Sequence, residues 1–204
     1  MTHLHWDHFD ETAARLVGEA GLRVLCQPGD GAKLRERGVV DVTEVSPTAT
    51  HNGVELHRTG GRRGQGELAE QMGAVSGFVL RARGEPSIYV AGDTVWCDEV
   101  EAALAEHRPD VVVVNAGAAT FTGAPPIVMD SADVVRVADA APDALVVAVH
   151  LEAVNHCIEG GRRCARWSRA RRVAVPEDGE TMAFTRRPTG RGKLSVTTRR
   201  PSTR

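Results

Sequence analysis

Hydrophobic and polar positions follow helical spacing in some segments of the chain, and in others they alternate or form short apolar runs. Helical spacing predicts helices over residues 10–20, 30–37, 98–107 and 130–140, with Asp10 and Asp130 as N-terminal caps. The other pattern predicts strands over residues 23–26, 39–45, 54–57, 76–83, 87–91, 110–115 and 145–149, and weaker strands over 172–175 and 181–185. Because strands and helices mix along the chain, the expected fold class is α/β or α+β, with helices on the faces of a sheet.

Two segments depart from these patterns. The stretch from Thr59 to Gly73 contains five glycines and two adjacent arginines, which predicts a long loop, and long loops inside a compact domain are usually functional or mobile. From Arg186 onward Pro, Gly, Thr and Arg dominate, which predicts little order. We therefore expect one domain over residues 1–185 and a basic, disordered tail over residues 186–204.

The composition is that of a water-soluble globular domain. The chain has 204 residues, enough for one domain with a core, and 42% of them are hydrophobic and 25% charged. No apolar run approaches the roughly 20 residues that cross a bilayer, and a polar, His-rich segment stands where a signal peptide would be apolar. Four scattered cysteines without paired spacing indicate reduced thiols, and we expect a cytoplasmic protein with no membrane partner.

The net charge of −2 conceals a basic end. From Gly160 onward there are 13 Lys and Arg residues against 3 Asp and Glu residues. Such an end can contact nucleic acid or another anionic surface, but it lacks interleaved aromatic residues. The pattern therefore favours a solvated tail over a nucleic-acid partner, and it does not indicate an oligomeric state.

The first eight residues concentrate metal-binding side chains. His3, His5, Asp7 and His8, here called the N-terminal cluster, place three imidazoles and a carboxylate within six positions. These groups suit zinc, iron, manganese and related divalent ions. On an extended segment His3 and His5 point to the same side, and Asp7 and His8 at the following bend can reach a second ion. The alternative is a His-rich tail or the remnant of a tag.

Two further polar residues, Asp93 and His150, follow predicted strands, and a third, His156, lies six residues after His150. Asp93 ends the segment Ile88-Tyr89-Val90-Ala91-Gly92-Asp93, so that a carboxylate lies at a strand end where it can bridge two ions; the alternative is a turn or a helix cap. His150 directly follows the apolar strand 145–149, and it is either a metal ligand or a polar cap of that strand. His156 is a candidate metal ligand, substrate contact or surface residue, and we take substrate binding as its expected role.

The chain resembles the metallo-β-lactamase-fold superfamily of metal-dependent hydrolases. The resemblance lies in the order of three features: the N-terminal cluster, the strand that leads into Gly92-Asp93, and the strand that leads into His150. The resemblance is closest to the branch of ascorbate-phosphate lactonase-like proteins, and it extends over most of the chain. The matching segments are Thr2 to Asp10, Met72 to Leu80, Ala91 to Thr94, and Val149-His150. The resemblance implies an αββα sandwich.

The resemblance also implies a ligand set and a mechanism. His3 and His5 would hold a first ion, Asp7 and His8 a second, Asp93 would bridge them and His150 would complete the second site. The cofactor would be one or two divalent ions, most simply zinc, with manganese or iron as alternatives. The ions would activate a hydroxide that Asp7 orients, and the substrate would be a small molecule.

One expected ligand is missing from the chain. The family places a further first-site histidine in the glycine-rich loop, and the residue that aligns with it here is Arg63. A guanidinium offers no lone pair, and its fixed charge repels a cation. His57 or His51 would replace the histidine only if the chain shifted its register.

Two other features differ from the family pattern. The family fold normally begins with several strands ahead of the N-terminal cluster, whereas this sequence starts at the cluster, so we expect a sandwich without its first strands. The segment from Glu159 to Arg172, where a helix is expected, lacks a clean apolar stripe and is rich in arginine. A local shift of the reading frame is one hypothesis for this patch.

Three functions remain in view. The first is a metal-dependent hydrolase that acts on a small ester, lactone or phosphorylated metabolite. The second is a degenerate or truncated member of the family with one ion or none and little activity. The third is a nuclease of the same superfamily, which the missing aromatic platform disfavours.

Overall fold

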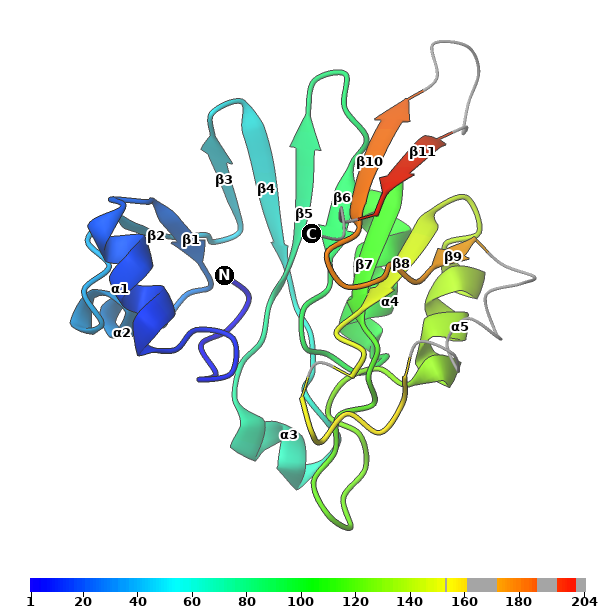
Figure 1. The fold of residues 1–204 in the computed structure, drawn as a ribbon, viewed down its shortest axis with the longest axis horizontal. Helices are drawn as coiled ribbons and strands as arrows, with labels where there is room; N and C mark the ends of the chain where they lie inside the picture. Colours follow the sequence, from blue (N-terminus) through cyan, green and yellow to red (C-terminus); the bar gives the residue numbers. More distant parts are fainter. Residues whose placement is uncertain (153, 161–171, 187–193, 201–204) are drawn as a thin grey trace.

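A mixed seven-stranded sheet forms the centre of the protein. The computed structural model describes residues 1–152, 154–160, 172–186 and 194–200, and within them the sheet has sequential strand order (Figure 1). Its strands are β3 (Thr48–His51), β4 (Val54–Thr59), β5 (Gly77–Ala82), β6 (Ile88–Val90), β7 (Val111–Asn115), β8 (Leu145–Val149) and β9 (Val173–Ala174). Neighbours are antiparallel from β3 to β6 and parallel from β6 to β9.

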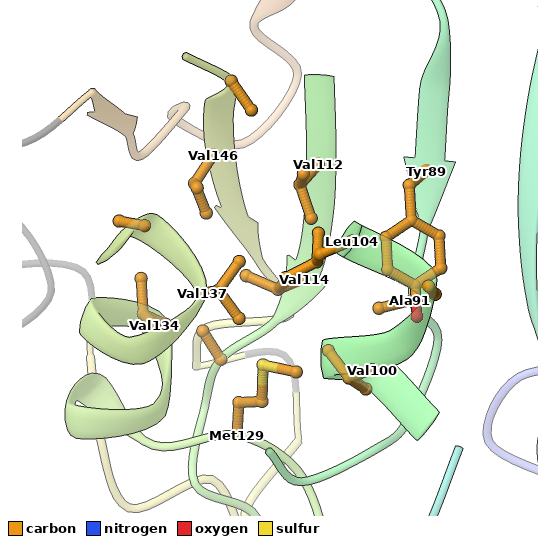
Figure 2. Close-up of a cluster of buried hydrophobic side chains, with 14 of the residues drawn as sticks. Tyr89, Ala91, Val100, Leu104, Val112, Val114, Met129, Val134, Val137 and Val146 are labelled. Carbon is orange, nitrogen blue, oxygen red and sulfur yellow. The ribbon is translucent and has the colours of Figure 1, made fainter. Parts of the chain in front are cut away.

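Helices α4 (Asp98–His107) and α5 (Ser131–Ala140) cover one face of this sheet. Figure 2 shows apolar side chains of both helices, among them Val100 and Val137, directed at side chains of β6, β7 and β8. Alternate strand residues face this layer, as expected for a strand period of two, and Tyr89, Val112 and Val146 are fully buried there. This packed layer fixes the strand ends that carry the polar residues described below.

The opposite face of the sheet is covered by two smaller units. Strands β1 (Val24–Cys26) and β2 (Val42–Glu44) form a parallel pair with helices α1 (Glu11–Glu19) and α2 (Gly31–Glu36). This unit contacts β4 and β5 through Leu25, Leu56 and Phe78. The hairpin of β10 (Thr181–Arg186) and β11 (Leu194–Arg199) covers β7 and β8, where Met182 and Phe184 pack on Val111 and Val147. The layers have the αββα order that the resemblance implies.

Local signals explain most of the elements. The carboxylate of Asp10 accepts the backbone N–H of Ala13, and that of Asp130 accepts the N–H of Asp133, so the two predicted caps of α1 and α5 are confirmed. The predicted helix over 98–107 and the strands over 76–83, 87–91, 110–115 and 145–149 are confirmed within a few residues.

Several expectations were wrong or incomplete. The stretch from Thr59 to Gly73 is not a loop throughout, because helix α3 (Glu67–Met72) interrupts it. None of its six residues is fully buried, and its apolar stripe is limited to Leu68 and Met72, too short to predict a helix. The strand over 39–45 is shortened to β2, and β3 was not predicted. Contrary to the disorder expected after residue 186, Leu194–Arg199 pairs with β10; residues 187–193 and 201–204 lie outside the described residues.

An apolar groove of about 440 Å³ lies between the β1–β2 unit and the central sheet. Its lining includes Met1, Leu25, Phe78, Leu80 and Val90.

The two strand pairs β1–β2 and β10–β11 share no hydrogen-bonded sheet within the described residues. The expectation that the sandwich lacks its first strands stays a prediction. The patch from Glu159 to Arg172 falls largely outside the described residues, so the proposed reading-frame shift also stays a hypothesis.

Among the described residues, no helix is long and apolar enough to cross a membrane.

Candidate metal centre

The carboxyl ends of the parallel strands bring the predicted site residues to one edge of the sheet. Asp93 follows β6, Asn115 ends β7 and His150 follows β8, and these three strands are parallel neighbours. Strand β4 has the same direction, since it is separated from β6 by the antiparallel β5, and the loop that follows it carries Arg63. The sheet topology therefore gathers side chains from four separate segments.

The N-terminal cluster reaches this edge through backbone contacts. The Thr2 carbonyl accepts the N–H of Ser76 at 3.1 Å, next to the start of β5, and the Met1 amino group donates to the Leu25 carbonyl at 2.8 Å. Gly92 allows the close approach, because its φ is +75° and a Cβ there would lie 3.1 Å from the Thr2 Cβ. His3 is thereby held beside Asp93.

The carboxylate of Asp93 is fully buried and surrounded by nitrogen atoms. Its Oδ2 lies 3.5 Å from His3 Nε2, 3.2 Å from His8 Nε2 and 2.9 Å from an Arg63 nitrogen. Its Oδ1 accepts a hydrogen bond of 2.5 Å from the Asn115 side chain. A buried carboxylate is costly unless it is paired, so this arrangement requires positive charge around Asp93.

Three of these atoms have the geometry of a metal site. Ligand atoms of His3, His8 and Asp93 lie within 4.8 Å of one another and converge in a buried space. His3 Nε2, His8 Nε2 and Asp93 Oδ2 form no hydrogen bond of good geometry within the described part of the chain, although all three are buried. Buried polar atoms normally have partners. Two imidazoles, once neutral, and one carboxylate therefore fit a divalent ion such as zinc.

Burial and neighbouring charges shift the pKa values of His3, His8 and Asp93, and the two histidines shift in opposite directions. Burial lowers the pKa of His3 to about 4, and this outweighs the attraction of Asp93, so His3 is neutral and able to coordinate at neutral pH. The Asp93 carboxylate, with Oδ2 3.2 Å from His8 Nε2, raises the pKa of His8 despite burial. Burial alone would raise the pKa of Asp93, but His8, Asn115 and Arg63 outweigh it and hold this pKa well below its ordinary value.

The other predicted residues lie around this core at different distances. Asp7 Oδ2 is 3.8 Å from His8 Nε2, and the His150 ring stacks on the His8 ring with centroids 5.2 Å apart. His150 Nδ1 lies 3.8 Å from the Cys157 sulfur. His156 instead stacks on Phe121, with ring centroids 6.3 Å apart, and among the described residues its ring has no hydrogen bond or ring contact with the N-terminal cluster. Its role in substrate binding stays a prediction.

Arg63 occupies the place where the resemblance requires a histidine. Its Nη1 lies 3.3 Å from His5 Nε2 and its Nη2 contacts Asp93, while the side chain is only 4% exposed. His57 does not replace the missing ligand, because it pairs with Glu55 and lies against His107. The residues described here thus fit one ion well, and they do not fit a second ion at the His3/His5 position.

The model of the beta-lactamase superfamily domain matches residues 1–151 of the chain. The chain belongs to the beta-lactamase superfamily. Within the superfamily it is 34% identical over 189 residues to the UPF0173 protein YddR of Bacillus subtilis, covering 90% of this chain and 74% of that relative. The chain spans about half the length of the other curated relatives it matches, which are named UPF0173 metal-dependent hydrolases.

Two solved structures of the superfamily are similar in both sequence and fold. An isothiocyanate hydrolase from Delia radicum gut bacteria has 32% identity and a TM-score of 0.83, covering 90% of this chain and 75% of that one. A possible metal-dependent hydrolase from Veillonella parvula has 34% identity and a TM-score of 0.82, covering 87% and 72%. The fold class expected from the sequence is therefore confirmed, and so is the family.

Sequence reasoning missed one residue of this superfamily member's centre. Asn115 was predicted only as the end of a buried strand, yet its amide fixes the second oxygen of Asp93. The signal was present, since a lone polar residue after Val111–Val114 marks the carboxyl end of the strand next to the one that carries Asp93. Only the strand order, which the sequence does not give, connects the two residues.

Proposed function

We propose that this chain is a metal-dependent hydrolase whose ion is bound by His3, His8 and Asp93, with Asp7 and His150 beside them. The single observation that carries the proposal is the convergence of three buried, hydrogen-bond-free ligand atoms within 4.8 Å. The names of the UPF0173 relatives support it. Zinc is the first choice among metals, since imidazole and carboxylate are its common ligands.

Asn115 and Asp7 have separate roles beside the proposed ion. A divalent ion bound here would lower the pKa of a coordinated water from near 16 toward about 7 and polarise the bond under attack. Asn115 holds Asp93 in one orientation through Oδ1, so that Oδ2 faces the histidines. Asp7 is the partly exposed carboxylate beside His8, and we assign it the role of accepting the proton of the attacking water and orienting it.

The substrate is proposed as a small electrophile. An ester, a lactone or a phosphorylated metabolite offers a carbonyl carbon or phosphorus that activated water attacks. The similar isothiocyanate hydrolase adds a further class, because the central carbon of an N=C=S group is also electrophilic. Four probes represent these classes: p-nitrophenyl acetate, a γ-lactone, bis-p-nitrophenyl phosphate and benzyl isothiocyanate.

Metal removal should abolish hydrolysis reversibly. Treatment of the purified protein with a chelator is expected to reduce turnover of at least one probe by at least about a hundredfold, since the nucleophile is then ordinary water. Added zinc should restore the rate. The matched control is His57→Ala, which removes a histidine outside the centre and should leave rate and metal content unchanged. No metal-dependent turnover of any of the four probes would contradict the proposal and favour a degenerate member.

Metal affinity should fall as the pH falls below the raised pKa of His8. In the metal-free protein Asp93 favours the protonated form of His8, and an ion must displace that proton because only a neutral imidazole coordinates. Apparent zinc affinity should therefore decrease about tenfold per pH unit once the pH is below this pKa. Competition with a zinc-binding dye between pH 5 and about 8 measures the slope. An affinity independent of pH over this range would show that His8 is not a ligand.

A further inference from the structure

We propose that the guanidinium of Arg63 takes the place of one of the two cations that this kind of centre can hold, so that the chain binds a single divalent ion. The inference rests on the metal-dependent function proposed above. It assigns His5 a different role from His3 and His8, since His5 would hold the guanidinium and the other two histidines would hold the ion. The centre would then combine one exchangeable cation with one that is part of the chain.

The Arg63 guanidinium contacts the same side chains that a metal ion at the first site would contact. Its two terminal nitrogens reach the two groups that a first-site ion would contact, Asp93 Oδ2 at 2.9 Å and His5 Nε2 at 3.3 Å. A guanidinium only donates hydrogen bonds, so the lone pair of His5 Nε2 faces it and is not available to an ion. His3 Nε2 and His8 Nε2 have no such donor within the described residues.

The backbone fixes Arg63 in this place. The N–H of the preceding Arg62 donates to the Thr94 hydroxyl at 2.8 Å, and the Arg62 carbonyl accepts the N–H of Val95 at 2.9 Å. Both bonds join the loop to the residues that directly follow Asp93. The Arg63 side chain is therefore buried beside the carboxylate as part of the folded structure, and it is not a mobile surface arginine.

The charges of the centre favour one ion over two. The carboxylates of the centre are Asp93 and Asp7, and Arg63 already supplies a fixed positive charge in contact with Asp93. A second divalent ion would add two more positive charges within a few ångströms of the guanidinium, where screening by water is weak. It would also have to displace Arg63 from both His5 and Asp93. Replacement of Arg63 by a neutral ligand should relieve both obstacles.

Metal content measured on the purified, zinc-equilibrated protein tests the inference. Wild type should retain about one zinc per chain, whereas Arg63→His, which adds an imidazole and removes the charge, should retain about two. Arg63→Lys keeps the positive charge but lacks the two terminal nitrogens of the guanidinium, and it should still retain about one zinc per chain. His5→Ala should keep the single ion in the wild-type background, and it should abolish the second ion in the Arg63→His background.

Loading with manganese provides a second, spectroscopic readout on wild type and on Arg63→His. Wild type should give the electron paramagnetic resonance spectrum of isolated Mn²⁺, and Arg63→His should give that of two exchange-coupled ions. Two ions in wild type, or loss of the ion in His5→Ala, would overturn the inference while leaving the proposed hydrolase intact. A wild-type protein without any bound ion would overturn both.

Discussion

Replacement of Asp93 by alanine is expected to empty the metal centre and to reduce hydrolysis by at least about a thousandfold, because activated water is lost with the ion. Asp93 is the only fully buried carboxylate in the described centre, and its Oδ2 is shared by His3, His8 and Arg63. Without it, three nitrogen groups face one another with no negative charge between them. Asp93→Asn should lose the ion as well, since it keeps the shape of the side chain and removes only the charge.

Two measurements check this prediction. Zinc content after dialysis and turnover of the best probe are compared among Asp93→Ala, Asp93→Asn and wild type, with circular dichroism to confirm folding. Asp41→Ala is a matched control, because Asp41 is an exposed carboxylate paired with Arg23 on the surface, and both quantities should be unchanged. Retention of wild-type zinc affinity by Asp93→Asn would show that the ion lies elsewhere.

The second large effect concerns the core that positions the strand ends. Tyr89→Ala should lower the free energy of unfolding by about 3–5 kcal/mol, as truncations of buried aromatic residues do. Tyr89 is fully buried between β6 and α4 beside Val100 and Ala91 (Figure 2). Its ring lies so close to Gly77 that a Cβ there would be 2.8 Å from Cε2, so the surrounding backbone has little freedom to close the cavity.

Urea denaturation of metal-free protein measures this change. Tyr89→Phe is the matched control, since it keeps the ring and removes only the hydroxyl, and it should lose no more than about 1 kcal/mol. A loss below about 1 kcal/mol for Tyr89→Ala would contradict the packing described for this face of the sheet. Zinc should stabilise wild type beyond its metal-free form, because an ion that binds only the folded chain shifts the equilibrium by mass action.

Those elements of the fold that carry a local physical signal were predictable from the sequence. Asp10 and Asp130 cap helices because their carboxylates reach backbone N–H groups three residues on. Helix α3 was missed because its apolar stripe is only Leu68 and Met72, which pack against the cluster that contains Ile127 and Val128. Strand β11 was missed because its pairing with β10 is a tertiary contact that its polar composition conceals. In both cases packing at a distance decided the structure, and composition did not.

The candidate site was predictable as a set of residues but not as a geometry. The density of His3, His5, Asp7 and His8, and the strand-end positions of Asp93 and His150, were visible in the sequence. The sequence did not separate His5, which faces Arg63, from His3 and His8, which face Asp93. That division depends on how the loop after β4 folds against the turn after β6, and Asn115 entered the site for the same reason.

Anomalous X-ray diffraction at the zinc absorption edge, from crystals grown with zinc, tests the metal centre most directly. The predicted result is a single strong peak within bonding distance, about 2.0–2.2 Å, of His3 Nε2, His8 Nε2 and Asp93 Oδ2, with Arg63 still in contact with His5. The absence of a peak among these three residues, with zinc bound only at the surface, would contradict the account.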